Sequence, residues 1–286
     1  CSSRSSITND SVSGDSDDEY STDSSSEYSD DDIIVNAYIK NYPVSLIVLE
    51  KCKKTLDDYM INNELSDTEW ACILIQIIIQ LYAYQKTFDF THNDLHTNNI
   101  MYVETPKEYL NYCINNTYYK VPTFGKIWKI IDFGRAIFKF KDNIFCSDSF
   151  HPKGDAAGQY NCKPFLNVNK PTLEPNTSFD LCRLGCSLFD LFFEDIDECN
   201  KENLSDIKKL IVKWCQDDNK RNILYKSNGK ERYPEFKLYK MIARTVHHCS
   251  PEKELLLPIF QQFVVPHKKI SKKQVIMNID LLPKYY

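Results

Sequence analysis

Three oxygen-bearing side chains in two short segments could carry chemistry in this sequence. Asp94 and Asn99 belong to the run His92–Asn99, and Asp132 begins the triplet Asp132-Phe133-Gly134. A carboxylate can accept or orient the proton of a hydroxyl, and carboxylate and amide oxygens bind hard divalent cations such as Mg²⁺. Such groups suit phosphoryl transfer, in which the protein mainly positions the reactants and neutralises charge. The alternative is that all three are ordinary loop residues, because Asp and Asn favour turns.

Each segment follows an element that can hold it in place. Ser66 and Glu69 form a capping-box signature, which predicts the start of a helix. Apolar residues then recur at three- and four-residue spacing: Trp70, Ile73, Leu74, Ile77, Ile78, Leu81 and Tyr84. This spacing predicts a buried helix that ends near Phe90, just before the first segment. The apolar run 128–131 predicts a strand that leads directly into Asp132.

The order of the two segments resembles the large lobe of protein kinases. His92–Asn99 is similar to the family's His-x-Asp-Leu-x-x-x-x-Asn catalytic loop, and residues 132–134 match its Asp-Phe-Gly motif. The resemblance implies that Asp94 receives or orients the proton of the acceptor hydroxyl. It also implies that Asn99 and Asp132 hold Mg²⁺ ions on the phosphates of ATP. His96 stands where the family usually has Lys, and its imidazole could donate to the transferring phosphate.

Further positions resemble the parts of that family that support the catalytic loop. The run 179–189 looks like the central helix of the large lobe, whose Asp, here Asp180, holds the backbone of the catalytic loop. By the same match, His92 and Phe133 would stack in the family's hydrophobic spine, and Gly134 completes the metal-loop motif. Plain core packing is the alternative for Phe133, and both interpretations can hold together.

The nucleotide-binding residues are also assigned by resemblance. Residues 46–52 are similar to the fifth strand and the hinge of the family. This match makes Leu49 the gatekeeper, directs the backbones of Glu50 and Cys52 toward the adenine, and places Met101 under the adenine ring. For Leu49 and Met101 the alternative is again core packing.

We therefore expect an α+β protein with a kinase-like fold, formed by a mainly α-helical large lobe and a remnant of about two strands of the small lobe. Residues 1–32 are expected to be a disordered acidic segment, and residues 33–52 the strand remnant (Ile33–Ile39 and Val44–Leu49) and hinge. Residues 53–286 are expected to form the large lobe. A short helix is expected at Thr55–Met60, and later helices at Ile207–Trp214, Phe236–Val246 and Glu254–Val264.

Several features depart from the family pattern. No glycine-rich phosphate loop precedes the hinge, and Lys40 is read as the end of a strand rather than as the family's phosphate-binding Lys. Asn93 stands where many regulated kinases carry an Arg that receives an activation-loop phosphate, which argues against control by that route. Asp94 and Asp132 are also unusually far apart in sequence. The excess, about residues 104–126, is expected to be an insertion, either a docking surface or a loosely structured loop.

Composition limits the partners of the chain. Residues 1–32 hold ten acidic residues and one basic residue, Arg4, and they could be a phosphorylated segment or a solvated linker. The remaining residues carry 34 basic and 30 acidic side chains, too balanced to indicate nucleic-acid binding.

No apolar run has the ~18–20 residues that a membrane helix needs. Eleven irregularly spaced cysteines and no signal peptide favour reduced thiols and a cytoplasmic location rather than secretion.

The expected activity is transfer of the γ-phosphate of ATP, with Mg²⁺, to Ser or Thr of a protein substrate. Two alternatives remain open: a catalytically impaired pseudokinase or scaffold, and a small-molecule kinase, which His96 favours. The Ile-, Asn-, Lys- and Tyr-rich composition is similar to that of kinase-like proteins of giant DNA viruses, which would place the protein in the host cytoplasm or the virion. The sequence does not indicate an oligomeric state.

Overall fold

The computed structural model describes residues 41–44 and 46–286. The chain divides into two compact units, Cys1–Glu50 and Lys51–Tyr286. The predicted disordered segment 1–32 and the predicted strand Ile33–Ile39 lie outside the described residues. The predicted strand Val44–Leu49 is wrong, because its described residues form neither helix nor strand and their side chains are exposed, Val48 at 92%. A β-branched run becomes a strand only where its backbone finds a hydrogen-bonded partner.

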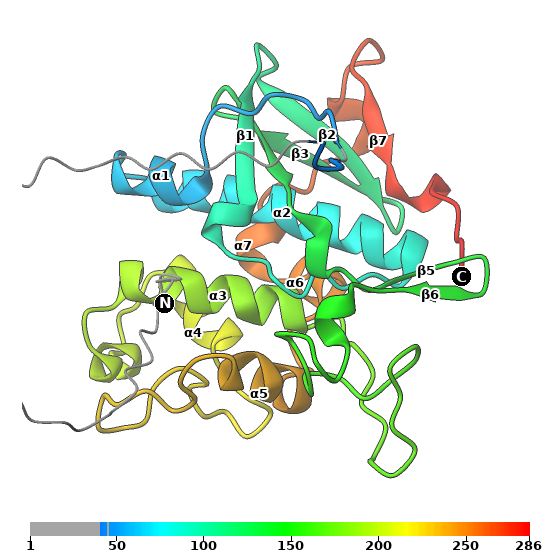
Figure 1. Ribbon diagram of the computed structural model, residues 1–286. Coiled ribbons are helices and arrows are strands. Elements are labelled where there is room, and N and C mark those ends of the chain that lie inside the picture. Colours follow the sequence, from blue (N-terminus) through cyan, green and yellow to red (C-terminus); the bar gives the residue numbers. More distant parts are fainter. Residues whose placement is uncertain (1–40, 45) are drawn as a thin grey trace, which may run out of the picture. The chain divides into compact units, whose positions relative to one another are not determined.

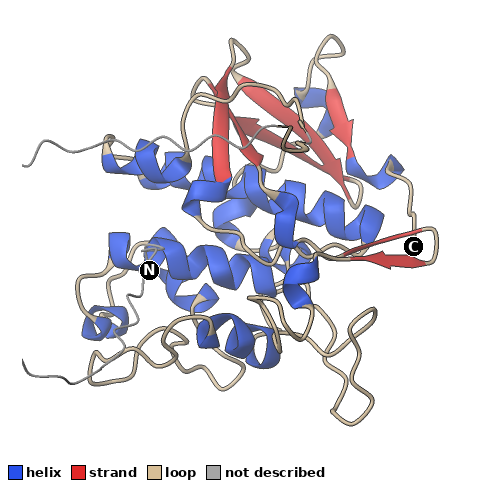
Figure 2. Cartoon of the chain, in the orientation of Figure 1, coloured by secondary structure: helices blue, strands red, loops and turns tan. Residues whose placement is uncertain are grey.

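The second unit mixes α and β elements, so the expectation of an α+β protein is confirmed at that level (Figure 2). Its described helices are α1 (Leu56–Ile61), α2 (Asp67–Phe88), α3 (Phe179–Phe192), α4 (Asp206–Trp214), α5 (Lys237–Thr245), α6 (Pro251–Glu254) and α7 (Pro258–Gln261). Its described strands are β1 (Ile100–Glu104), β2 (Tyr109–Ile114), β3 (Thr117–Pro122), β4 (Lys126–Ile130), β5 (Phe138–Phe140), β6 (Asn143–Phe145) and β7 (Ile276–Asn278).

Helix α2 is the centre of this unit, with strands on one side and α3 and α4 on the other (Figure 1). The predicted capping box is confirmed: the Ser66 hydroxyl accepts the Glu69 N–H at 3.3 Å, and the Glu69 carboxylate accepts the Ser66 N–H at 3.1 Å. Most side chains of α2 are buried. The helix ends at Phe88, because Asp89 adopts a left-handed conformation with φ 48°. The buried helix α2 thus supports the chain just before the segment 92–99.

Strands β1 and β4 form an antiparallel hairpin that brings the two candidate segments together. Their register pairs Ile100 with Ile130 and Glu104 with Lys126. Asn99 directly precedes β1 and Ile131 directly follows β4, so the two residues lie at the same end of the hairpin. There the Ile131 N–H donates to the Asn99 carbonyl at 3.0 Å. The hairpin register, rather than any local sequence feature, fixes the distance between the segments.

The insertion between β1 and β4 is an ordered hairpin, so the alternative of a loosely structured loop is wrong. Strands β2 and β3 pair antiparallel, and β7 adds to β2 in parallel, which gives the strand order β3-β2-β7. Leu110, Tyr112 and Ile114 of β2 are buried. The apolar area that these residues bury orders the insertion, as it does for any three-stranded sheet packed on a helix.

The carboxyl-terminal third differs from prediction in one element. Helices α4 and α5 confirm the predictions for 207–214 and 236–246 to within a residue or two, and α1 confirms that for 55–60. The single helix predicted for 254–264 is wrong, because two short helices, α6 and α7, replace it. Pro258 begins α7 and lacks the N–H that would continue α6. Among the described helices, none is long and apolar enough to cross a membrane.

Helices α3 and α4 pack against each other at Gly185. A Cβ on Gly185 would lie 2.8 Å from the Cβ of Trp214 and 3.3 Å from the Sγ of Cys215. Trp214 and Cys215 are fully buried. Only glycine therefore allows this separation of the two helices.

Candidate active site

The backbone of the segment 92–99 is held by a carboxylate from α3. One oxygen of Asp180 accepts the N–H of His92 and the other accepts the N–H of Asn93, each at 2.9 Å. Asp180 is fully buried. Burial raises the pKa of its carboxyl, and the two backbone hydrogen bonds act in the opposite direction by stabilising the charged form. Asp180 thus makes the backbone contacts that its predicted supporting role requires.

His92 links the segment to the strand that precedes Asp132. Its Nδ1 accepts the backbone N–H of Asp94 at 3.3 Å, so this nitrogen carries no proton. The proton of the neutral ring is therefore on Nε2, which donates to the carbonyl of Ile131 at 2.9 Å. The ring also contacts Phe133, with centroids 5.5 Å apart at 47°. The predicted stacking of His92 with Phe133 thus takes the form of a tilted ring contact, and the Phe133 side chain is 43% exposed.

Asn99 and Asp132 present oxygen atoms at the end of the β1–β4 hairpin. The Asn99 amide nitrogen donates to the Asp94 carbonyl at 2.9 Å, so the amide oxygen is the atom that remains for a cation. Asp132 is exposed and adopts a left-handed conformation with φ 61°, in which its Oδ1 accepts the Gly134 N–H at 3.3 Å. A Cβ on Gly134 would lie 3.1 Å from that same Oδ1. Glycine at this position therefore keeps the carboxylate accessible.

The donor set fits a magnesium ion that is shared with a phosphate ligand. Among the described residues, no group of three or more His, Cys, Asp and Glu side chains could hold a metal ion by itself. Asn99 and Asp132 offer only hard oxygen ligands. Mg²⁺ is usually bound by one or two carboxylates together with water and substrate phosphates, rather than by a complete protein cage. The two residues would hold such an ion, which would neutralise phosphate charge.

Asp94 is surrounded by three groups from different elements. The hydroxyl of Tyr239, on α5, donates to its Oδ1 at 2.7 Å. Arg135 Nη1 lies 3.6 Å from its Oδ2, and His96 Nε2 lies 3.9 Å from its Oδ1. Burial, and next the positive charge of Arg183, lower the pKa of His96, which favours the neutral imidazole. The Asp94 side chain keeps 20% of its area exposed, so a ligand can still reach it.

Three residues near Asp94 were not anticipated from the sequence. Arg135 directly follows the Asp-Phe-Gly triplet, so adjacency could have indicated it. Arg183 lies one helical turn after Asp180 on α3, and this spacing could have placed both on one face. Tyr239 carries no local signal, because only the packing of α5 brings it to the site.

Asn93 connects the segment 92–99 to the chain that follows Gly134. Its side chain is fully buried and its φ is 66°, in the left-handed region. Its amide nitrogen donates to the Arg135 carbonyl at 3.0 Å. Its amide oxygen accepts from the Tyr160 hydroxyl at 2.6 Å and from the Gln159 amide at 3.3 Å. A neutral side chain therefore joins three separate stretches of chain.

The predicted nucleotide-binding residues divide between the two units. Leu49, which is 76% exposed, and Glu50 belong to the first unit. In the second unit, the chain just after Cys52 runs beside β1: Lys53 N–H donates to the Tyr102 carbonyl at 2.8 Å, and Thr55 bridges to Met101. This pairing brings Cys52 and Met101 onto adjacent stretches of chain.

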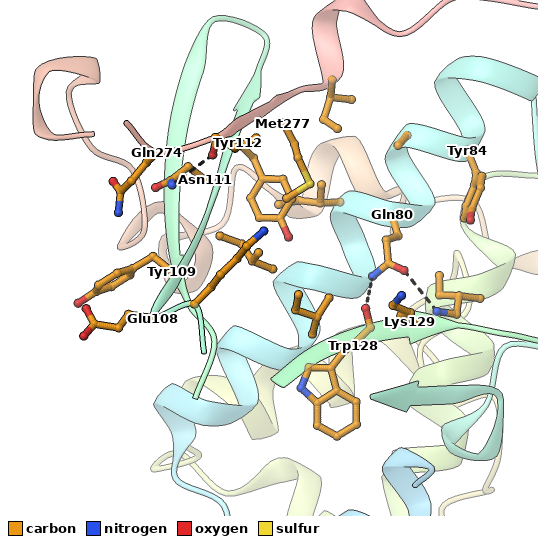
Figure 3. A pocket seen from close by; sticks show the side chains of 18 of the residues that line it. Gln80, Tyr84, Glu108, Tyr109, Asn111, Tyr112, Trp128, Lys129, Gln274 and Met277 are labelled. Carbon is orange, nitrogen blue, oxygen red and sulfur yellow. Dashed lines mark hydrogen bonds between the residues drawn. The ribbon is translucent and has the colours of Figure 1, made fainter. Parts of the chain in front are cut away.

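A cavity of about 700 Å³ is lined by residues of α2, β2, β4 and the segment 273–279 (Figure 3). Its lining is mostly apolar, and none of the predicted site residues contributes to it. Within it, the Gln80 amide donates to the Trp128 carbonyl at 2.9 Å and accepts the Ile130 N–H at 3.3 Å. These bonds attach β4 to α2 just before Asp132. The hydrogen bonds of Gln80 thus explain how α2 supports β4.

Comparison with known proteins adds no assignment. No protein-family model matches the chain, and no curated protein matches its sequence significantly.

Proposed function

We propose that this protein transfers the γ-phosphate of ATP to a Ser or Thr hydroxyl of a protein substrate, with Mg²⁺, as a member of the kinase-like fold. The observation that carries the proposal is the joint anchoring of the two loops. Asp180 holds the backbone of the segment that bears Asp94, and the hydrogen bond from the Ile131 N–H to the Asn99 carbonyl ties that segment to the residue before Asp132. These anchoring contacts support the assignment that the sequence resemblance implies.

In this proposal each residue has one task. Asp94 orients the acceptor hydroxyl and receives its proton as the new oxygen–phosphorus bond forms and the bond to ADP breaks. His96, in its neutral form, donates a hydrogen bond to the transferring phosphoryl group. Asn99 and Asp132 would hold the Mg²⁺, which would supply neutralisation of phosphate charge. Catalysis would come from positioning and electrostatics, as is general for phosphoryl transfer.

Nucleotide binding tests the first half of the proposal. We expect the melting temperature to rise with ATP plus Mg²⁺ and to rise less with ATP alone, because a ligand at a hundred times its Kd adds about 2.7 kcal/mol to stability. Asp132→Asn should remove the Mg²⁺-dependent part of the rise. Asp142→Asn is a matched control, since Asp142 is also exposed and left-handed, with φ 62°, but lies in the β5–β6 turn. A complete lack of response to nucleotide would overturn the proposal.

Acceptor choice tests the second half. Radiolabelled ATP should label generic protein substrates on Ser or Thr, and it should not label amino alcohols or sugars. Labelling of small molecules alone would identify a small-molecule kinase. Binding without any transfer would leave a nucleotide-binding scaffold.

A further inference from the structure

We infer that Tyr239 and Arg183 form a positioning pair that fixes the orientation of the Asp94 carboxylate, so that Oδ2 is the oxygen that meets the acceptor hydroxyl. The inference rests on the proposed function and adds two residues to its site. Tyr239 comes from α5 and Arg183 from α3. Neither belongs to the segments that carry the predicted catalytic residues.

The direction of each hydrogen bond in the pair is determined by chemistry. Arg183 Nε lies 2.9 Å from the Tyr239 oxygen, and a guanidinium can only donate. The phenol oxygen therefore accepts from Arg183. Its own proton is left for Asp94, whose Oδ1 lies 2.7 Å away and accepts it. Arg183 therefore donates to Tyr239, and Tyr239 donates to Asp94, in a chain of two hydrogen bonds with one direction.

Burial makes this chain rigid. Arg183 is 6% exposed, and its guanidinium lies over the Tyr239 ring at 5.1 Å from the centroid. The ring is also packed between Phe179 and Phe236, with centroids 6.3 and 5.1 Å away. Desolvation raises the pKa of Tyr239, so the phenol keeps its proton near neutral pH. The donor that faces Asp94 is therefore present at neutral pH.

Charge gives the pair a second effect. A buried guanidinium needs a compensating negative charge, and Asp94 lies on the far side of the phenol. Burial lowers the pKa of Arg183, but the contact with Tyr239 and, after it, the Asp94 charge raise the pKa above its ordinary value. The pair thus polarises the phenol toward Oδ1 and occupies that oxygen. Oδ2 has Arg135 Nη1 at 3.6 Å, beyond hydrogen-bond distance, and keeps its capacity for the acceptor hydroxyl.

The test is Tyr239→Phe, which deletes only the hydroxyl. We expect kcat for transfer to fall about tenfold to a hundredfold while KM for ATP stays unchanged, because misorientation of a reacting group by about 1 Å costs on the order of a hundredfold. The matched control is Tyr225→Phe. Tyr225 also donates to a carboxylate at the end of α3, Asp190, at 2.8 Å, but lies outside the site. Its loss should leave kcat unchanged.

A double variant separates positioning from general support of the fold. In the Asp94→Asn background, Tyr239→Phe should lower the residual transfer no further, since residues that act as one unit are not additive. If the two substitutions lowered transfer independently, the inference would be overturned. It would also be overturned if kcat rose in Tyr239→Phe because the phenol had blocked Asp94. A wild-type chain that transfers no phosphate overturns the proposed function itself. An active wild type with an unaffected Tyr239→Phe variant overturns only the positioning pair.

Discussion

The hydroxyl of Tyr160 donates a 2.6 Å hydrogen bond to the Oδ1 of Asn93, and the bond joins the segment after Gly134 to the candidate catalytic loop. Under the proposed function, Asn93 stands where many regulated kinases carry an Arg that receives a phosphate on the activation loop. Here the link is a buried amide and a phenol, neither of which carries a charge. We therefore expect the segment to hold its position without phosphorylation.

Asn93→Ala should strongly destabilise the protein. The Asn93 amide makes four hydrogen bonds, to Thr91, Arg135, Gln159 and Tyr160, at a net ~1 kcal/mol each before non-additivity. Alanine is also less tolerant of φ 66° than asparagine. We expect the free energy of unfolding, measured with urea, to fall by about 3 kcal/mol. Asn93→Gly should lose about 1 kcal/mol less, because glycine accepts the left-handed backbone. Equal losses would contradict the backbone part of this explanation.

Gly185→Ala should destabilise the packing of α3 on α4. Helix propensity alone would favour alanine by about 1 kcal/mol. The new Cβ, however, would meet the Trp214 Cβ at 2.8 Å, and overpacking of this kind costs about 1–3 kcal/mol. Denaturant unfolding should therefore show a net loss. Ser187→Ala, a half-buried position on the same helix, is the control and should change stability little. A gain for Gly185→Ala would mean that the two helices can separate freely.

His96 should make stability depend on pH in a defined direction. Burial and Arg183 lower its pKa below the ordinary 6.5, so the unfolded chain binds a proton here at a higher pH than the folded chain does. Stability must therefore decrease as the pH falls through 6.5 toward the lower folded pKa. His96→Gln removes this proton site. The stability of wild type relative to the variant should be greater about one unit above pH 6.5 than about one unit below it. The opposite order would show that His96 is charged in the folded protein.

Asp94→Asn should separate binding from transfer. Loss of the proton acceptor should lower transfer by about a hundredfold to ten-thousandfold. The Mg²⁺-dependent thermal shift with ATP should persist, because Asn99 and Asp132 are intact. Asp190→Asn is the control, since Asp190 also accepts a phenol proton but lies at the far end of α3. Unchanged turnover in Asp94→Asn would mean that Asp94 has another role.

Local sequence signals predicted the parts of this fold that local physics determines. The Ser66–Glu69 capping box and the apolar spacing after it gave α2 almost to the residue, and Pro258 marked a helix break that could have been recognised. The Val44–Leu49 strand failed because β-branched residues need a partner strand, which a run of residues cannot reveal. The contact of Tyr239 with Asp94 spans 145 residues and depends on the packing of α5. Contacts of this kind are decided by tertiary packing.

The pairing of β7 with β2 has a consequence for handling the protein. Strand β2 has β3 on one side and β7 on the other, and Asp280, just after β7, also accepts the N–H groups of Asn115 and Asn116 at 2.7 and 2.9 Å. Proteolytic clipping ahead of Ile276 would remove this cover and leave a row of unpaired amides and carbonyls along β2. Such an edge is a template for strand addition between molecules. Residues 276–286 thus cover this edge of β2, and a truncation that removes them should promote self-association.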